Sequence, residues 1–314
     1  MSLPRHHPPE IREYHCVSKC VDDQHLLTPT EETTYIIARV WEMAQAKYDF
    51  TLCALMGMSN HTHDEIRLGQ TPLPRIQQFV KSQIARRMNR VLGRSGAFWM
   101  RRYHDTAILD AEASSSSVHY QHANPVRASL SEHAESWIGT TSHRAFVEGK
   151  DSFTASWFDE RSWKRAGSDP ERKDEFVRKA TVRIGAPIAF DGLSEAERDA
   201  LRASMRARME AEEQAAASAR AMEGELPPRP QAAARIDPRS RPDQPKRGGR
   251  PEGRLRRRVR AAGEASLVEA LADAYAIKLP VYRRASERYR RTGVLCAFPS
   301  GMYPPWIPHA FEVT

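Results

Sequence analysis

Residues 50–63 read FTLCALMGMSNHTH, an apolar run followed by a short polar turn and a His-x-His pair. An apolar run of this length, bounded by turn residues, predicts a buried β-strand. The Ser-Asn turn predicts a second strand over 61–68, paired with the first as a hairpin. Because strand side chains alternate between faces, His61 and His63 point to the same side and can hold a metal ion together. His-x-His also arises by chance, so the rest of the chain must supply a nucleophile, a third ligand and a substrate surface.

The composition is that of a chain with one large domain or two small ones. A chain of 314 residues is long enough to bury a hydrophobic core. Its 40% apolar and 28% charged residues are typical of a globular protein. The formal net charge of +8 favours a polyanionic partner such as nucleic acid, although a solvated basic surface gives the same total.

The cysteines and the N-terminal residues bear on the compartment. Four cysteines (Cys16, Cys20, Cys53, Cys296) are too few for a disulfide scaffold, and we expect buried thiols. The first nine residues contain no apolar stretch that could act as a signal peptide, and no run approaches the roughly 20 apolar residues of a membrane helix. We therefore expect a cytoplasmic protein without a membrane partner.

Further elements surround the predicted hairpin. Residues 13–21 alternate as a first strand, and Thr28-Pro29 predicts the start of a helix that ends near Lys47. A helix with a regular apolar stripe is expected over 73–92, a strand over 106–109 and a helix over 112–123. These elements predict an α+β domain with a central antiparallel sheet and helices mainly on one face.

Basic and aromatic residues alternate from the 73–92 helix onward. Cationic side chains bind phosphates and exposed aromatic rings stack on unpaired bases, whereas most Phe and Trp residues simply belong to a core. The DNA-binding candidates are Lys81, Arg86, Arg87, Arg90, Trp99, Arg101, Arg102 and Tyr103.

Tyr120 lies on the 112–123 helix, with His119 and His122 beside it and Asn124 at its end. Because Pro125 disfavours helical geometry in the preceding residue, Tyr120 and Asn124 share a face only if the last turn survives. The two histidines are packed or surface residues, or they assist proton transfer beside the tyrosine.

A different composition begins after residue 150. We expect a helical extension over 151–222, whose long helix opens with a Ser194–Glu197 capping box. Residues 223–263 are predicted to form a basic flexible linker, with an arginine-rich run that is either solvated or a phosphate clamp. Residues 264–314 are expected to contain C-terminal helices, one of them over 265–277, and a short strand over 294–299.

The ordered set of motifs resembles the single-tyrosine HUH transposases, and within them the REP-associated tyrosine transposase branch. The resemblance spans about residues 10–145, under half of the chain. It is carried by Tyr14-His15, by 58–63 (MSNHTH), by 99–103 (WMRRY) and by 120–128 (YQHANPVRA). It implies a ferredoxin-like or RRM-like HUH nuclease fold.

The resemblance also implies a chemistry. His61, His63 and Asn124 would hold Mg²⁺ or Mn²⁺, and Tyr120 would attack a phosphodiester of single-stranded DNA. The product would be a 5′-phosphotyrosine and a free 3′-hydroxyl, and reversal would rejoin strands. Hairpins of palindromic repeats are the expected substrate, bound by a monomer or homodimer at the nucleoid.

Two acidic residues depart from the family pattern directly after the histidine pair. On an ideal strand Glu65 shares the face of His61 and His63, as an extra ligand or as a carboxylate at the rim of the metal site. Asp64 would face the core, so either the strand ends at His63 or Asp64 has a partner there.

Two other functions remain open from the sequence. The same scaffold can recognise DNA hairpins without cutting them. It can also act as a nuclease that uses water, with Tyr120 in a structural role.

Overall fold

The predicted hairpin is present and forms one edge of the central sheet. The computed structural model describes residues 4–242 and 261–305. Strand β2 (Phe50–Gly57) pairs antiparallel with β3 (His61–Leu68), and the Met58 amide donates to the His61 carbonyl at 2.8 Å to close the turn.

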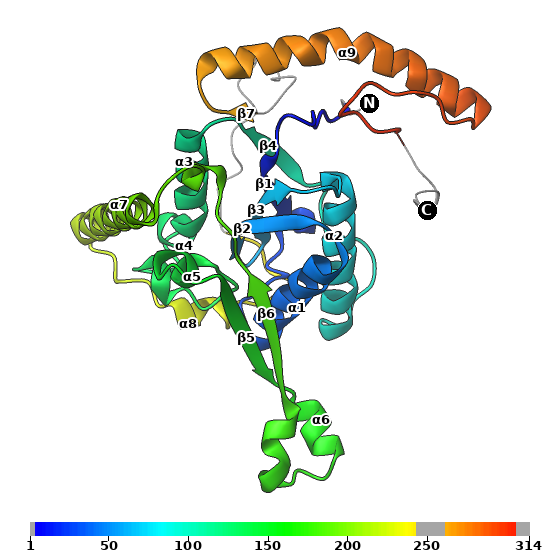
Figure 1. Cartoon of the computed structure of the whole chain (residues 1–314). Coiled ribbons are helices and arrows are strands. Elements are labelled where there is room, and N and C mark those ends of the chain that lie inside the picture. Colours follow the sequence, from blue (N-terminus) through cyan, green and yellow to red (C-terminus); the bar gives the residue numbers. More distant parts are fainter. Residues whose placement is uncertain (1–3, 243–260, 306–314) are drawn as a thin grey trace.

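The central sheet has the order β2-β3-β1-β4-β7 (Figure 1). Strand β1 (Glu13–Lys19) lies between β3 and β4 (His104–Ile108) and is antiparallel to both. The two-residue strand β7 (Ala261–Ala262) is parallel to β4 and lies within the segment expected to be a linker. The α+β class with a central, mostly antiparallel sheet is confirmed.

Strand alternation divides the sheet into two differently used faces. Helices α1 (Glu31–Lys47) and α2 (Leu73–Val91) cover the face that carries Tyr14, Cys16 and Ile66, and form the main core there. The opposite face is covered by α3 (Ala111–His122) and α5 (His143–Val147), so the helices are distributed over both faces (Figure 1).

Helix α1 begins later than expected. Its N-cap is Thr30, whose hydroxyl accepts from the Thr33 amide at 3.1 Å. The Thr28 hydroxyl instead donates to the His25 carbonyl at 2.7 Å, which stabilises the preceding turn. The expected start at Thr28-Pro29 is therefore wrong by two residues, about half a turn.

The extension after residue 150 is not helical throughout, contrary to the expectation for 151–222. Strands β5 (Ser152–Phe158) and β6 (Val177–Arg183) form a separate antiparallel hairpin, with α6 (Glu160–Arg165) at its projecting tip (Figure 1). The sequence there alternates only weakly, which hides the strands.

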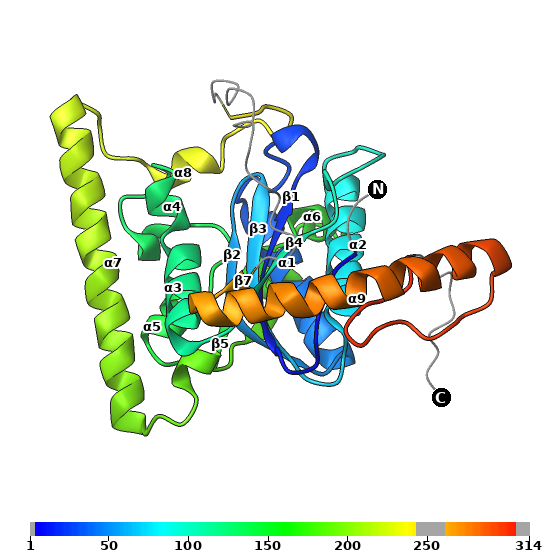
Figure 2. The same ribbon diagram turned by 90° about the horizontal axis from the view of Figure 1, so that it is seen from above.

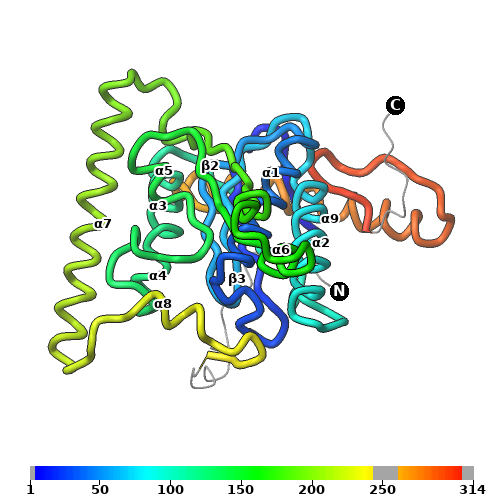
Figure 3. Tube along the Cα trace, turned by 90° about the horizontal axis from the view of Figure 1, so that it is seen from below, coloured from blue at the N-terminus to red at the C-terminus, as the bar shows by residue number. Residues whose placement is uncertain are grey.

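The long helix α7 (Glu195–Glu223) follows, and its Ser194–Glu197 capping box is confirmed. It runs beside α3, α5 and the short helix α4 (Asn124–Arg127) in two views of the molecule (Figures 2 and 3). The remaining short helices are α8 (Pro230–Ala233) and the 3₁₀ segments Val21–Asp23, Ala134–Ser136, Pro170–Phe176 and Ile188–Phe190.

The C-terminal helix is longer than expected. Helix α9 (Ala265–Thr292) continues past 277 and through Pro280. The segment 294–299 is not a strand: Phe298 packs against Tyr282 of α9 instead. The arginine-rich run falls mostly at 246–260, outside the described residues.

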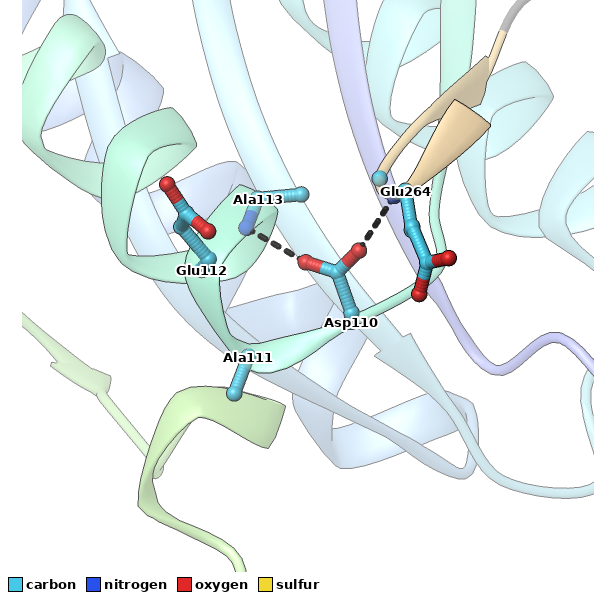
Figure 4. Close-up of a pocket in the computed structure, with 6 residues that line it drawn as sticks. Asp110, Ala111, Glu112, Ala113 and Glu264 are labelled. Atoms are coloured by element: carbon cyan, nitrogen blue, oxygen red, sulfur yellow. Dashed lines mark hydrogen bonds between the residues drawn. The ribbon is translucent and has the colours of Figure 1, made fainter. Parts of the chain in front are cut away.

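Asp110 joins α3 to the start of α9 (Figure 4). Its carboxylate accepts from the Ala113 amide at 2.8 Å, as the N-cap of α3, and from the Glu264 amide at 2.6 Å. Glu264 is itself the N-cap residue of α9. Gly263 has φ +149°, and a Cβ there would lie 2.8 Å from the Asp110 carboxylate, so the close approach requires glycine. One side chain therefore stabilises two helix starts.

We expect Asp110→Ala to lower the free energy of unfolding by about 1–2 kcal/mol, because the cap of α3 and the link to Glu264 are lost together. Urea unfolding followed by circular dichroism measures this. Asp237→Ala is the control, since its turn lies outside this junction. A loss no larger than that of the control would contradict the double role.

Asp64 has the core partner that the sequence requires. Strand β3 continues to Leu68, and Gln77 of α2 donates its amide N–H to the buried Asp64 carboxylate. Burial raises the pKa of Asp64 from 3.8 to about 7, against the smaller opposing effects of Gln77 and Lys81. The carboxyl therefore holds its proton more tightly in the folded chain than in the unfolded one.

The unfolding free energy is consequently expected to fall between about pH 4 and pH 7, by up to about 4 kcal/mol. Asp64→Asn cannot ionise and still accepts from Gln77. It should match wild type at pH 4 and exceed it at pH 8 by on the order of 2–4 kcal/mol in urea unfolding.

Asp105→Asn provides the opposite control for this pH dependence. Asp105 pairs with Arg5 at 2.7 Å and His7 at 2.8 Å, and its pKa is lowered despite the opposing effect of burial. Its replacement should lower stability at pH 8. An Asp64→Asn protein less stable than wild type at pH 8 would show that the ionised carboxylate is favourable.

Candidate active site

His61 and His63 lie side by side on the face of β3 that is covered by α3. Their ring centroids are 4.8 Å apart. Burial, with a smaller effect of Lys19, lowers the pKa of His61 to about 4, and burial also lowers that of His63. Both imidazoles are therefore neutral at pH 7 and each has a lone pair available for a metal.

Neighbouring side chains orient the two rings. His61 Nδ1–H donates to Asn60 Oδ1 at 2.6 Å, which leaves Nε2 as the lone-pair nitrogen. His63 Nδ1 lies 2.9 Å from His15 Nε2 and the two rings stack at 5.2 Å. With His63 as the donor in that bond, an assignment made from the hydrogen-bond network, His63 Nε2 also keeps its lone pair.

Asn124 reaches His63 because the helix survives past His122. Ala123 remains in the right-handed helical region, with φ −75° and ψ −9°, and α4 begins at Asn124 with Pro125 in its first turn. A proline early in a helix costs little, since its missing N–H would have no helical partner. Asn124 Nδ2 consequently lies 3.0 Å from His63 Nε2.

The donor set fits a divalent cation. Two ligands at about 2.1 Å from an octahedral ion and 90° apart lie about 3.0 Å from each other, as the Asn124 amide and His63 Nε2 do. A half-turn of the amide puts its oxygen beside the imidazole. Within residues 4–242 and 261–305 no three His, Cys, Asp or Glu side chains form a group that could hold a metal ion, so a metal bound here would take a different kind of donor, such as the Asn124 amide, beside the histidines.

Tyr120 stands at the open side of this cluster. Its ring centroid lies 5.9 Å from that of His63 and 6.3 Å from that of His15, and the residue is 43% exposed. The Arg127 guanidinium carbon lies 4.9 Å from the Tyr120 ring centroid. The structure thus brings together the predicted nucleophile and all three predicted ligands.

Glu65 lies beneath α3 and not at the rim of the site. It is fully buried, and its carboxylate accepts from Ser117 and Gln121 of α3. Burial, and then the nearby Glu13, raise the pKa of Glu65. Its contacts attach α3 to the sheet, which corrects the expectation of a ligand or rim carboxylate.

His119 and His122, for which an accessory role was expected, have partners other than Tyr120. His119 Nε2 lies 2.8 Å from Glu212 of α7, and His122 Nε2 lies 3.0 Å from the Ser142 hydroxyl. Burial lowers the pKa of both. His119 thus connects α3 to α7, and His122 packs against His143 and Phe146 of α5.

The basic candidates of α2 lie on the other face of the sheet from Tyr120. Arg86 and Arg90 are exposed there, whereas Arg87 contacts Gln83 and Met43. Lys81 donates to the Arg101 carbonyl at 2.8 Å, and burial lowers its pKa to about 8. These residues offer a positive surface that is separate from the histidine cluster.

The aromatic candidates have partners within the fold. Tyr103 is only 7% exposed, with Arg5 stacked on its ring, and is no platform for bases. Trp99 is half-buried and donates to the Lys81 carbonyl at 2.9 Å. Arg101 and Arg102 of the same segment are exposed. The segment is attached to the end of β1 by a hydrogen bond from the Met100 amide to the Lys19 carbonyl.

Four site residues had not been assigned to the site from the sequence. His15 and Asn60 orient the histidine pair, and Arg127, which pairs with Glu212, lies over the Tyr120 ring. Strand alternation could have placed His15 at the site. In the β1–β3 register His15 pairs with Glu65 and Val17 with His63, so His15 lies on the same sheet face as His63. Glu212 had no sequence signal, because it comes from a helix far along the chain.

No family model and no curated protein matches the sequence. Solved structures that are similar to parts of the chain include two transposases. A REP-associated tyrosine transposase bound to a REP hairpin is 20% identical, with a TM-score of 0.40 over 48% of this chain and 87% of its own. A candidate transposase from Deinococcus radiodurans R1 is 18% identical, with a TM-score of 0.28 over 36% of this chain and 89% of its own.

One further property concerns membranes. In the described parts of the chain, no helix has both the length and the apolar character needed to cross a bilayer.

Proposed function

We propose that this protein is a transposase that cleaves and rejoins single-stranded DNA through a phosphotyrosine at Tyr120, with a divalent metal ion held by His61, His63 and Asn124. Hairpins of palindromic repeats are the proposed substrate. Support for the proposal comes from the motifs that contain His15, His61, His63, Tyr120 and Asn124, whose side chains form one cluster. The 99–103 motif lies outside that cluster.

The observation that carries this proposal is an exposed phenol beside a buried, neutral imidazole–amide pair. Tyr120 is the partly open member, and His63 with Asn124 is the enclosed one. A structural tyrosine in this helix would need no pair of buried, neutral histidines, His15 and His63, next to its ring. A tyrosine that attacks phosphorus needs a site for the phosphate charge at that distance.

In the proposed reaction, the Tyr120 Oη atom attacks the phosphorus and forms a new P–O bond. The bond to the 3′-oxygen breaks, and that oxygen leaves as a hydroxyl after taking a proton from water. The phenol proton passes to solvent, to which Tyr120 is open. The phosphotyrosine ester conserves the bond, so attack by a 3′-hydroxyl reverses the step without ATP.

The protein side chains position the reactants. Asn60 and His15 fix the ring orientations of His61 and His63, and Glu65 holds α3, and therefore Tyr120, against the sheet through Ser117 and Gln121. Mg²⁺ or Mn²⁺, when bound, would polarise the scissile phosphate and neutralise charge on its oxygens. Such positioning requires a rigid scaffold, which the sheet provides.

The test uses wild-type protein with Mn²⁺ and foldback oligonucleotides that carry single-stranded flanks, including repeats that flank the gene. We expect a covalent protein–DNA adduct on a denaturing gel, and mass spectrometry should place the nucleotide on the peptide that contains Tyr120. Binding to the same hairpins without any adduct would instead support a DNA-binding protein on this scaffold.

A further inference from the structure

Arg127 lies against the face of the proposed nucleophile. It is the last residue of α4, and its guanidinium carbon is 4.9 Å from the Tyr120 ring centroid. Its side chain is 39% exposed. A cation so close to an exposed phenol stands where negative charge must be accommodated when a phosphodiester is attacked.

Helix α7 fixes the position of this cation. Arg127 Nε donates to Glu212 Oε1, and Nη2 donates to Glu212 Oε2 at 3.0 Å. The same carboxylate accepts from His119 Nε2 at 2.8 Å, so Glu212 joins the helix of the nucleophile to the arginine. The hydrogen bonds to Arg127 lower the pKa of Glu212, which keeps the pair charged.

Apolar packing supports the polar contact. Met209, one turn before Glu212 on α7, is buried against Ala123 and Val126, which lie on either side of the Asn124–Pro125 step. The carboxylate is therefore held by α7 and not by a mobile loop. Bidentate pairing leaves Arg less freedom than a single contact would.

The guanidinium has donors to spare. It carries five N–H bonds, and within the described chain Glu212 accepts two of them. Planar N–H groups of arginine match the oxygens of phosphate. A ligand at Tyr120 can therefore be bound by Arg127 without breaking its contact with Glu212.

We propose that Arg127 binds a non-bridging oxygen of the phosphodiester at Tyr120, and that α7 completes the site by positioning Arg127 through Glu212. The role in catalysis rests on the proposed function of Tyr120. The phosphate contact itself does not, because a phosphodiester can bind there without being cleaved.

The experiment separates binding from reaction. Affinity for a fluorescein-labelled oligothymidylate is measured by anisotropy across a salt series in EDTA. The rate of adduct formation is measured with Mn²⁺ at saturating foldback oligonucleotide. The variants are Arg127→Ala, Arg127→Lys and Glu212→Gln. Arg172→Ala is the matched control, since Arg172 binds Glu175 through the same Nε and Nη2 atoms, at 3.0 and 2.8 Å, in the distant hairpin.

For Arg127→Ala we expect the salt slope of log K to lose about 0.7 in magnitude, the value for one phosphate contact in a single strand. The adduct rate should fall about 100-fold. Arg127→Lys keeps the charge and the salt slope but loses the planar fork, so only its rate should fall. Glu212→Gln should react about tenfold more slowly while binding DNA more tightly, a split that a purely structural residue would not produce. Arg172→Ala should match wild type.

The outcomes distinguish the two proposals. A salt slope unchanged in Arg127→Ala, or wild type that fails to bind the oligothymidylate, overturns the phosphate contact whatever the rates are. A reduced slope with unchanged adduct rate overturns the role in catalysis. If Arg127→Ala has a reduced salt slope but the wild-type protein forms no adduct, the proposed function of Tyr120 is overturned and the phosphate contact stands.

Discussion

Tyr120→Phe is expected to abolish the covalent protein–DNA adduct and leave DNA binding unchanged. The substitution removes only the Oη atom that would attack phosphorus. The ring keeps its contacts with His63 and with the Arg127 guanidinium. Because the residue is partly exposed, the free energy of unfolding should change by no more than about 0.5 kcal/mol.

The measurement is adduct formation on foldback oligonucleotides with Mn²⁺, beside anisotropy binding of the same DNA. Tyr48→Phe is the control, since Tyr48 is the C-cap residue of α1 on the other face of the sheet. An adduct that persists in Tyr120→Phe would assign the nucleophile elsewhere. Strand cleavage that persists without any adduct would identify a nuclease that uses water.

His61→Ala is expected to weaken Mn²⁺ binding by at least about 100-fold, because loss of a direct ligand costs more than the 10–100-fold typical of residues that orient ligands. His61 is the less enclosed of the pair and its Nδ1 contacts only the adjacent Asn60 among the described residues, so the fold should tolerate the change. Isothermal titration with Mn²⁺ measures the affinity, and adduct formation should fall with it.

The control for the metal site is His25→Ala. His25 contacts Ser240 and lies outside the histidine cluster. It should bind Mn²⁺ as wild type does. Equal affinity of wild type and His61→Ala for Mn²⁺ would remove His61 from the donor set. Recovery of adduct formation in His61→Ala at high Mn²⁺ would show that the loss comes from weakened binding.

The strands and helices of the first domain could be predicted because their patterns are local. The apolar run of β2 and the stripe of α2 each mark one element. Alternation also placed His61 and His63 on one face and Asp64 in the core. The partner of Asp64 could not be named, because Gln77 reaches it from another helix.

The parts that could not be predicted depend on distant segments. Glu65 follows the alternation rule and shares the face of the histidines, yet α3 covers it and leaves Tyr120 open. Tyr103 and Trp99 are residue types that stack on nucleic-acid bases. In the fold, however, Arg5 stacks on the Tyr103 ring and Trp99 donates a hydrogen bond to the Lys81 carbonyl. The contact between Arg127 and Glu212 joins residues 85 apart in sequence, for which no spacing rule exists.

The junction at Asp110 and β7 has a consequence for the order of folding. Its hydrogen bond spans 154 residues, whereas β2 and β3 are adjacent in sequence. Closing so long a loop is slow, and a ribosome delivers the N-terminal residues first. We therefore expect the face with His61, His63 and Tyr120 to form during synthesis, before β7 covers the edge of β4. Until then that edge stays open to pairing with other nascent chains.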